Sequence, residues 1–194
     1  MEKVKDGKED SPWEFFHEND QLESRGNFKD DEMNGPWERF WDNGQLRWRG
    51  SYKDNELDGP MEWFYDNGQL ESRGNFKDGE QNGLYEEFYE NGQLRWRGNY
   101  KDNELDGLVE EFHENGQLEE KENYKDGKKD GLRELFHENG QLSKRENYKD
   151  GVLQDSGDGQ TADTITETTE TAPKDENAPV TAEPAEEVTV TLSK

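Results

Sequence analysis

GPWERFWDNGQLRWRGSYKDNELD, residues 35–58, decides the fold, because this 24-residue pattern occurs six times in succession. Its leading glycine and the leucine of its Gln-Leu pair recur at the same spacing along the chain. Self-similarity at such a period is typical of a repeat array rather than of a globular enzyme. We therefore divide the chain into a partial first repeat or cap at 1–10, six units at 11–34, 35–58, 59–82, 83–106, 107–130 and 131–151, and a tail at 152–194.

Each unit carries the signals of a β-hairpin. In residues 35–58 an aromatic run is followed by Asp42-Asn43-Gly44, and then by a segment in which apolar and polar residues alternate. Period-two alternation beside Asn-Gly is the strongest short-range hairpin signal. The polar links, such as KDNELDG and KDGKKDG, are rich in turn-forming residues. The sequence therefore predicts an all-β fold, an elongated antiparallel meander of six tandem hairpins.

The hairpin loop can be interpreted in two ways, and the choice decides which side chains share a face. A two-residue Asn-Gly loop would place Glu38 opposite Arg49. A three-residue loop, with Gly44 left-handed in a bulge, would instead place Phe40 opposite Leu46. We favour the three-residue loop, because the phenylalanine and the leucine recur in all six units and would then form part of one apolar stripe.

The predicted core is this stripe, with three large apolar groups per repeat. In the same register, Trp48 and Trp96 fall on the stripe's side of the sheet. The core residues are Phe16, Leu22, Phe40, Leu46, Tyr52, Phe64, Leu70, Phe76, Phe88, Leu94, Tyr100, Phe112, Leu118, Tyr124, Phe136, Leu142 and Tyr148.

The opposite face of the predicted sheet is rich in aromatic and arginine side chains, which protein interfaces use as anchors. Two other interpretations remain open: the protein's own curvature could cover this face, or its residues could form a cation-π ladder. The predicted partner-binding residues are Trp37, Arg39, Trp41, Arg47, Arg49, Met61, Tyr65, Tyr85, Tyr89, Arg95 and Arg97.

Composition restricts the partners of the chain. Only 26% of the 194 residues are hydrophobic, 38% are charged, and the formal net charge is −25. This is little apolar material for a closed core, whereas in an array each unit covers only its neighbour. The negative field repels nucleic acid and anionic lipid and attracts basic surfaces. We therefore expect another protein, basic in character, as the partner, with no direct nucleic-acid binding and no membrane binding; a homo-oligomer also fits an open array.

The two ends of the chain differ from the repeats. Residues 1–13 contain no apolar segment that could serve as a signal peptide or membrane span, so we expect a cytoplasmic location. Residues 152–194 contain no aromatic side chain and are dominated by Thr, Glu, Ala and Pro, which predicts a disordered acidic tail.

Residues that could carry chemistry have structural explanations. The chain has no cysteine and no Gly-rich phosphate loop, nucleophile elbow or HExxH segment. A glutamate and a basic residue recur in each unit, as at Glu38 and Arg49, and cross-strand or inter-repeat ion pairs explain both. The acidic links could collect Ca²⁺ but match neither an EF-hand loop nor a β-roll nonapeptide. We expect no catalytic residue, metal or cofactor. The three histidines occupy one repeat position, which is aromatic in the other units: His17, His113 and His137 against Trp41, Tyr65 and Tyr89.

The unit E-N-G-Q-L-x-x-R-G-N-Y-K-D-G-x-x-D-G, seen at residues 90–107 with a variable link, resembles the bacterial variant of the MORN repeat. The resemblance extends over residues 4–151. It implies an elongated twisted sheet used as an interaction platform. It also implies a relation to the YwqK-like group, whose members are often described as antitoxin or immunity components of toxin systems.

The expected function is therefore that of a non-enzymatic protein-binding module, an antitoxin or immunity protein that captures a basic toxin or effector. Two alternatives are a self-associating structural scaffold and an acidic DNA mimic that occupies a nucleic-acid-binding protein. Eukaryotic MORN arrays are also associated with membrane phospholipids, but the acidic charge balance of this chain opposes that role.

Overall fold

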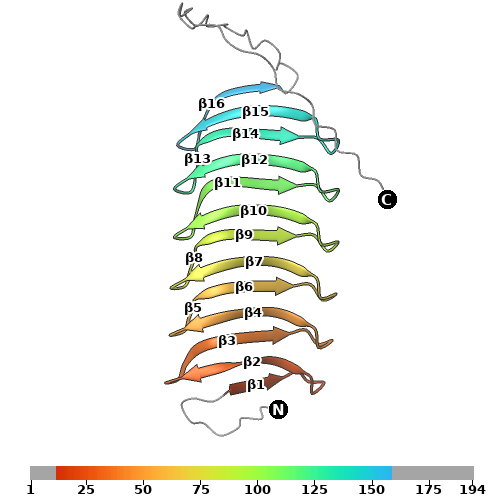
Figure 1. Cartoon of the computed structure of the whole chain (residues 1–194), viewed down its shortest axis with the longest axis vertical. Coiled ribbons are helices and arrows are strands. Elements are labelled where there is room, and N and C mark those ends of the chain that lie inside the picture. Colours follow the sequence, from red (N-terminus) through yellow and green to blue (C-terminus); the bar gives the residue numbers. More distant parts are fainter. Residues whose placement is uncertain (1–11, 159–194) are drawn as a thin grey trace, which may run out of the picture. The chain divides into compact units, whose positions relative to one another are not determined.

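The predicted hairpins are present and pair edge to edge in one open antiparallel sheet (Figure 1). The computed structural model describes residues 12–158. These residues form an all-β meander, as predicted, and include no helix that could cross a membrane. The strands are β1 (Pro12–Phe16), β2 (Leu22–Lys29), β3 (Glu32–Phe40), β4 (Leu46–Lys53), β5 (Glu56–Leu57), β6 (Gly59–Phe64), β7 (Leu70–Lys77), β8 (Glu80–Gln81), β9 (Gly83–Phe88), β10 (Leu94–Lys101), β11 (Glu104–Phe112), β12 (Leu118–Lys125), β13 (Lys128–Lys129), β14 (Gly131–Phe136), β15 (Leu142–Lys149) and β16 (Val152–Asp158).

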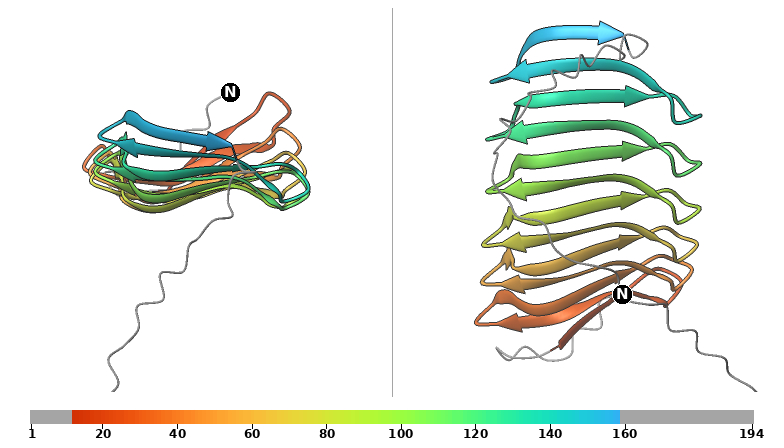
Figure 2. Two further views of the ribbon diagram at one scale, coloured as in Figure 1. Left: turned by 90° about the horizontal axis from the view of Figure 1, so that it is seen from above. Right: turned by 45° about the horizontal axis from the view of Figure 1, so that its top comes forward.

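The strands follow one another across the sheet in chain order. The short strands β5, β8 and β13 each pair only with the strand that precedes them in the chain, β4, β7 and β12 respectively. Figure 2 shows the sheet along its stacking direction and tilted, with the strands bowed and the hairpin loops aligned along one side. A meander of this kind leaves both faces of the sheet without a second layer among the described residues.

The hairpin loop has the three-residue form. Gly44 is left-handed, with φ of 84°, and its N–H donates to the Trp41 carbonyl at 2.8 Å. The Trp41 N–H donates to the Gln45 carbonyl at 2.8 Å, and Phe40 is paired with Leu46. The same loop recurs along the array, because a left-handed glycine follows the turn in the units that have Asn-Gly.

A β-bulge immediately after the loop changes the face on which the following residues lie. Phe40 is paired with Leu46, but its neighbour Arg39 is paired with Trp48, so that Arg47 is the extra residue. A register shift occurs at the equivalent place in β1–β2, β6–β7, β9–β10, β11–β12 and β14–β15. Because one extra residue reverses the side-chain alternation, the strand beyond the bulge is shifted relative to the predicted register.

The predicted core is therefore wrong in one respect. Phe40 and Leu46 lie on one face of the sheet, whereas Trp37, Trp48 and Tyr52 lie on the other. We call the second surface the aromatic face, and the surface that carries Phe40 the ladder face. The correction applies to the phenylalanine and leucine of every unit, which are partly exposed on the ladder face. The third member of the predicted stripe does lie on the aromatic face, where Phe28, Tyr52 and Tyr100 contact tryptophan rings.

The buried core is on the aromatic face. Trp37, Trp48 and Met61 form a buried cluster, with 6%, 4% and 5% of their surface exposed. Partly buried residues from units one to four pack against this cluster: Phe15, Phe28, Met33, Tyr52, Leu57, Trp63, Phe76 and Tyr85. Aromatic rings thus supply most of the packing in a chain with few aliphatic residues.

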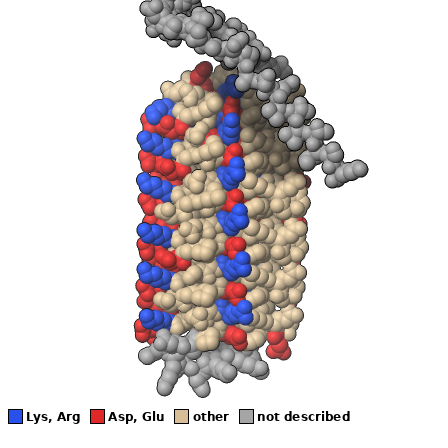
Figure 3. Space-filling view, in the orientation of Figure 1, with Lys and Arg blue, Asp and Glu red and all other residues tan. Residues whose placement is uncertain are grey.

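The ladder face carries the predicted ion pairs, and they form between repeats. Each basic residue of the first five units contacts the glutamate of the next hairpin, 13 positions further along the chain, whereas Arg145 of the sixth unit contacts Glu134 of its own hairpin at 2.7 Å. Figure 3 shows a column of alternating charges running along this sheet between uncharged surfaces. The pairs are Arg25–Glu38, Arg73–Glu86 and Arg97–Glu110 at 2.5 Å, Lys121–Glu134 at 2.7 Å, and Arg49–Glu62.

Hydrogen bonds at the loops also join neighbouring repeats. The indole N–H of Trp41 donates to the Phe64 carbonyl at 3.1 Å, and the hydroxyl of Tyr65 donates to the Phe88 carbonyl at 2.7 Å. Tyr89 makes the same bond to Phe112. The rings of His17 and His113 contact the equivalent carbonyls of Phe40 and Phe136. These histidines therefore make the same kind of contact between repeats as Trp41, Tyr65 and Tyr89 at that position.

Glycines on the aromatic face lie beneath the rings, and the source of the ring alternates from unit to unit. Gly50 is covered by Trp48 of its own hairpin, where an added Cβ would lie 2.6 Å from the indole. Gly74 is covered by Tyr85 of the following hairpin, again with 2.6 Å to an added Cβ. Gly26 follows the second pattern with Trp37, and Gly98 follows the first with Trp96. The first four units are therefore arranged as pairs.

Charged side chains replace the rings on the aromatic face of the last two units. Arg133 holds Glu120 with two hydrogen bonds of 2.6 and 2.7 Å, and it donates to Glu146 at 2.7 Å. Lys144 donates to the Glu146 carboxylate at 2.5 Å, and the Tyr148 hydroxyl donates to the same carboxylate at 3.0 Å. The hydrogen bonds from Lys144 and Arg133 hold the pKa of Glu146 at about 2. The array thus changes from aromatic to ionic packing along its length.

The boundary of the predicted tail is also corrected. Residues 152–158, which the composition assigns to the disordered segment, form β16 and pair with β15. The polar sequence can add a strand because β15 offers an edge of unpaired backbone groups. The rest of the predicted tail, 159–194, and the predicted cap, 1–10, lie outside the described residues.

Candidate functional site

The aromatic face is interrupted in the third unit. Rings from Trp13 to Trp63 form a continuous series of contacts with centroids 5.4 to 6.2 Å apart. A second group begins at Tyr85, whose ring lies 6.1 Å from Trp96 and 6.2 Å from Tyr100. The break falls at Ser72, which occupies the repeat position of Trp48 and Trp96. A serine between units that carry tryptophan removes one ring from the row.

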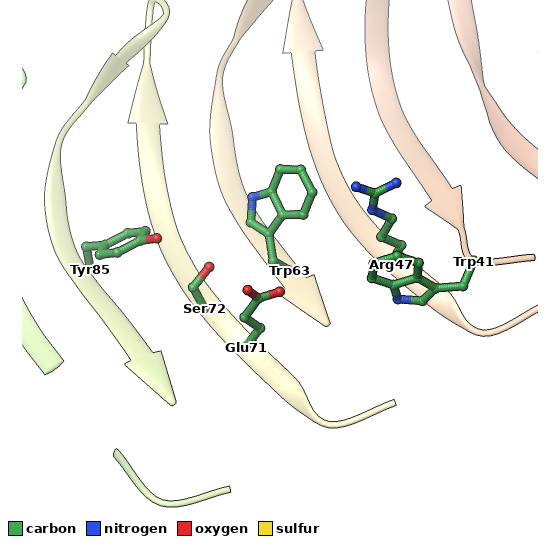
Figure 4. A pocket seen from close by; sticks show the side chains of 6 residues that line it. All are labelled: Trp41, Arg47, Trp63, Glu71, Ser72 and Tyr85. Carbon is green, nitrogen blue, oxygen red and sulfur yellow. The ribbon is translucent and has the colours of Figure 1, made fainter. Parts of the chain in front are cut away.

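A pocket of about 350 Å³ opens at this break (Figure 4). Ser72 is only 5% exposed, and its hydroxyl lies between the rings of Trp63 and Tyr85 (Figure 4). The sheet fixes this arrangement, because Trp63 on β6 is directly paired with Ser72 on β7. The lining residues are Trp41, Arg47, Trp63, Glu71, Ser72 and Tyr85.

Two opposite charges line the pocket at different places. The Arg47 guanidinium lies over the Trp41 ring, 4.3 Å from its centroid. The half-buried Glu71 makes no hydrogen bond or ion pair with any residue in 12–158. Its counterpart in the fifth unit, Glu119, lies 3.3 Å from the ring of His113. Glu71 is therefore a carboxylate beside aromatic walls that still lacks a cationic partner within the described sheet.

Burial also affects the phenol at the edge of the pocket. Burial raises the pKa of Tyr85, while the hydrogen bond with Ser72 opposes that shift. The ring therefore stays a neutral phenol at neutral pH and keeps an uncharged aromatic face toward the pocket. This arrangement can bind and orient a side chain, because it combines flat apolar walls with one acceptor.

Three of the predicted partner-binding residues come together in this pocket, namely Trp41, Arg47 and Tyr85. Trp37 and Met61, by contrast, are buried in the core and cannot serve as exposed anchors. Their assignment to the partner surface is corrected, since the bulge turns the tryptophan side of the hairpin into the packed side.

Arg49 and Arg97 are also corrected, because they lie on the ladder face. Each forms an ion pair with the glutamate of the next repeat, Glu62 and Glu110 respectively. They therefore point away from the pocket.

The remaining predicted residues make contacts within the sheet. Arg39 lies over the Trp48 ring at 5.9 Å, and Arg95 lies 3.5 Å from Glu87. Tyr65 and Tyr89 donate hydrogen bonds to the following hairpins. The cation-π ladder considered from the sequence is thus present in part, at Arg39 and Arg47.

Sequence reasoning missed three lining residues, Trp63, Glu71 and Ser72. A signal for them exists in the repeat, because one position reads Ser24, Trp48, Ser72 and Trp96 in successive units. A small residue between large ones at an inward position predicts a gap in the packing. That inference requires the face on which each side chain lies, and the bulge, which the sequence does not signal, reverses the predicted face.

Metal binding has no counterpart among the described residues. Residues 12–158 contain no group of three or more His, Cys, Asp or Glu side chains that could hold an ion. The link turns are two-residue loops in which both central residues are left-handed, as at Asp54 and Asn55 with φ of 52° and 67°. Asn55 uses its side-chain oxygen to accept from the Met33 N–H at 2.7 Å.

Comparison with known families identifies the repeat. The model of the MORN repeat variant family matches residues 9–30, 33–54, 57–78, 81–102, 105–126 and 129–150. The chain belongs to the MORN repeat variant family. The matched MORN segments start two residues before the units defined above. No curated protein matches the chain.

Membership has two consequences for the site. MORN repeats are commonly modules that bind proteins or membranes, and the repeat itself is non-catalytic. The pocket over Ser72 is built from three successive MORN repeats, because Trp41, Trp63 and Tyr85 each come from a different one. The pocket is thus a product of the array and is absent from any single repeat.

Proposed function

We propose that this MORN array is a non-enzymatic module that captures a basic protein on its aromatic face. The observation that carries the proposal is the pocket over Ser72, an aromatic recess on the sheet of a chain with a net charge of −25. Aromatic residues in partly desolvated pockets are the usual energetic centres of protein interfaces.

Charge and aromatic packing would act at different stages of capture. The negative field attracts a cationic partner over long distances and speeds encounter, in a manner that weakens with salt. Burial of Trp63 and Tyr85 against the partner would slow dissociation. In this mechanism charge sets the rate of association and the buried aromatic contacts set the rate of dissociation.

The finer proposal is that the partner is a toxin or effector and that the chain acts as its antitoxin or immunity protein in the cytoplasm. Its support is the resemblance to the YwqK-like group together with the acidic charge of the chain. A protein of this role has to occlude its partner by binding, which an open sheet can do without any catalytic step.

The test uses the purified full chain and the purified product of the adjacent gene, measured by calorimetry at low and moderate salt. We expect binding, and we expect Trp63→Ala to weaken it at least tenfold, whereas Trp13→Ala at the far end of the same face has a small effect. Absence of binding at both salt concentrations contradicts the proposal. Binding that is lost steeply with salt but is indifferent to Trp63→Ala would favour the DNA mimic instead.

A second candidate function, self-association, is favoured by the end of the sheet. β16 has only β15 as a partner within the described residues, and Val152 and Leu153 are 62% and 47% exposed. An unpaired edge can add another strand. Light scattering at increasing concentration distinguishes the two functions, because a strict monomer removes the scaffold.

A further inference from the structure

We propose that the pocket over Ser72 is a receptor for one arginine side chain of the protein partner. The inference deepens the proposed function by naming the group that is recognised, and it rests on that function only for the source of the arginine. Its chemistry stands on three features of the pocket: two aromatic walls, one carboxylate without a partner among residues 12–158, and a separate guanidinium already stacked at the rim.

The first feature is the pair of walls. Trp63 and Tyr85 each have a ring neighbour on the side away from the pocket, at 6.1 Å in each case, and no ring contact among the described residues joins Trp63 to Tyr85. Figure 4 shows the Trp63 ring nearly face-on and the Tyr85 ring tilted toward its edge, so a planar group entering above Ser72 could stack on the face of one ring and contact the other. Guanidinium groups stack well on aromatic faces, because they are flat and weakly hydrated.

The chain itself uses this type of contact on the same face. The Arg47 guanidinium lies 4.3 Å from the Trp41 ring centroid, and the Arg39 guanidinium lies 5.9 Å from the ring of Trp48. On the ladder face the distance from guanidinium to ring is similar, since Arg73 lies 5.6 Å from the centroid of the Phe88 ring. An arginine from a partner would thus extend a pattern that the repeats already contain.

The second feature is Glu71. Every glutamate of the inter-repeat ladder from Glu38 to Glu134 has a basic partner, whereas Glu71 has none within 12–158. In the fifth unit the equivalent carboxylate, Glu119, approaches the ring of His113. The third unit has Tyr65 at that place, which supplies no cation. A guanidinium between the rings could instead donate to the Glu71 carboxylate, in the two-bond geometry that favours arginine over lysine.

The third feature is Arg47, which lies in the same pocket and carries the opposite charge to Glu71. Figure 4 shows Arg47 above Trp41, while Glu71 and Ser72 lie on the side of Trp63 and Tyr85. A bound arginine is therefore attracted by one wall residue and repelled by the other. This opposition gives the proposal a sign test, because an uncharged aromatic occupant would respond to neither charge in this way.

The test measures binding of the peptide acetyl-Gly-Arg-Gly-amide to the full chain by NMR titration at low salt. The control peptide carries citrulline, which has nearly the shape of arginine and no charge. We expect Glu71→Gln to weaken arginine binding about tenfold, since a charge-assisted hydrogen bond is lost. The matched control is Glu23→Gln, which removes the same charge at the equivalent position of the first unit. We expect Arg47→Gln to tighten binding.

A variant that fills the pocket completes the test. Ser72→Trp alone would place two rings over Gly74, because Tyr85 already covers that glycine. Ser72→Trp/Tyr85→Met instead copies the Trp48 and Met61 combination of the preceding units, so we expect it to fold, as judged by an unchanged far-UV circular dichroism spectrum. This double variant should abolish arginine binding.

The proposal is overturned if citrulline binds as well as arginine, or if Glu71→Gln and Glu23→Gln have equal effects, or if the folded double variant still binds arginine. It is also overturned if a Gly-Trp-Gly peptide binds more tightly than the arginine peptide. The proposed function is judged separately: capture of the adjacent gene's product by the double variant leaves that function in place and removes only the pocket from its contacts. If the chain binds the arginine peptide but does not capture the adjacent gene's product, the arginine pocket stands and the proposed function fails.

Discussion

Substituting alanine for Gly50 should destabilise the fold when Trp48 is present and stabilise it when Trp48 is absent. An added Cβ at Gly50 would lie 2.6 and 2.8 Å from Cζ2 and Cη2 of the indole. Carbon atoms in contact are about 3.5 to 4.0 Å apart, so the ring must move outward. Trp48 is the most buried aromatic residue of the core, at 4% exposure, and its ring contacts both Tyr52 and Trp63. Moving it disturbs the whole row.

The size of the effect follows from two opposing contributions. Overpacking a filled site costs about 1–3 kcal/mol. Replacing a strand glycine by alanine returns about 0.5–1 kcal/mol, because the unfolded chain loses freedom. Gly50→Ala should therefore lower the free energy of unfolding by about 0.5–2 kcal/mol in the native background. In a Trp48→Ser background, which copies the serine of the neighbouring units, the same substitution should raise it by about 0.5–1 kcal/mol.

The assay is a double-mutant cycle on the full chain. Urea unfolding of the native chain, the two single variants and the double variant, followed by far-UV circular dichroism, gives a coupling free energy of about 1–3 kcal/mol between Gly50 and Trp48. If Gly50→Ala changes stability equally in both backgrounds, the ring does not depend on the glycine and the explanation of the repeat glycine fails.

Three other predictions concern contacts between repeats. The carboxyl of Glu146 has a pKa of about 2 in the folded chain, below its ordinary value. Its contribution to the free energy of unfolding is therefore present above about pH 4.5 and is lost as the pH falls toward 2. When unfolding midpoints are measured over this acid range, Glu146→Gln should lose less stability than the native chain. Tyr65→Phe removes the hydrogen bond to the Phe88 carbonyl and should cost about 0.5–1.5 kcal/mol in urea unfolding. The control is Tyr52→Phe, which should be nearly neutral because other units have phenylalanine at that position. Glu86→Ala removes the partner of Arg73, whose half-exposed guanidinium stays hydrated, and should cost about 0.2–1 kcal/mol in thermal unfolding; a variant as stable as the native chain would show that the ladder contributes nothing at this position.

Much of the fold can be predicted from the repeat because the decisive signals are local. Asp42-Asn43-Gly44 specifies its loop through the left-handed glycine, and the 24-residue period specifies that each hairpin is followed by an equal one. The bulge at Arg47 has no such signal. A bulge is a compromise between the loop, which pairs Phe40 with Leu46, and the sheet beyond it, which pairs Glu38 with Arg49. Each of the two registers considered from the sequence was right for one part of the hairpin.

The site was less accessible from sequence because it depends on the face and on differences between repeats. Tryptophan is a typical interface anchor, but the shifted register buries Trp37 against Gly26. Ser72 looks unimportant in its own unit, and its role emerges only from comparison with the tryptophan at that place one repeat earlier. The strand β16 shows a related limit, since its polar sequence follows the edge that β15 offers rather than any pattern of its own.

The alternating origin of the rings over the glycines means that this chain can be shortened or lengthened safely only by two hairpins at a time. Excising residues 59–82 would splice the second unit to the fourth, so that Trp48 and Tyr85 would compete for the space above Gly50. Excising 59–106 instead would bring Val109 to that place, and a valine already packs near Gly98 beside Trp96. In the first four units the structural unit that can be removed or added is thus a pair of repeats, although the sequence repeats every 24 residues.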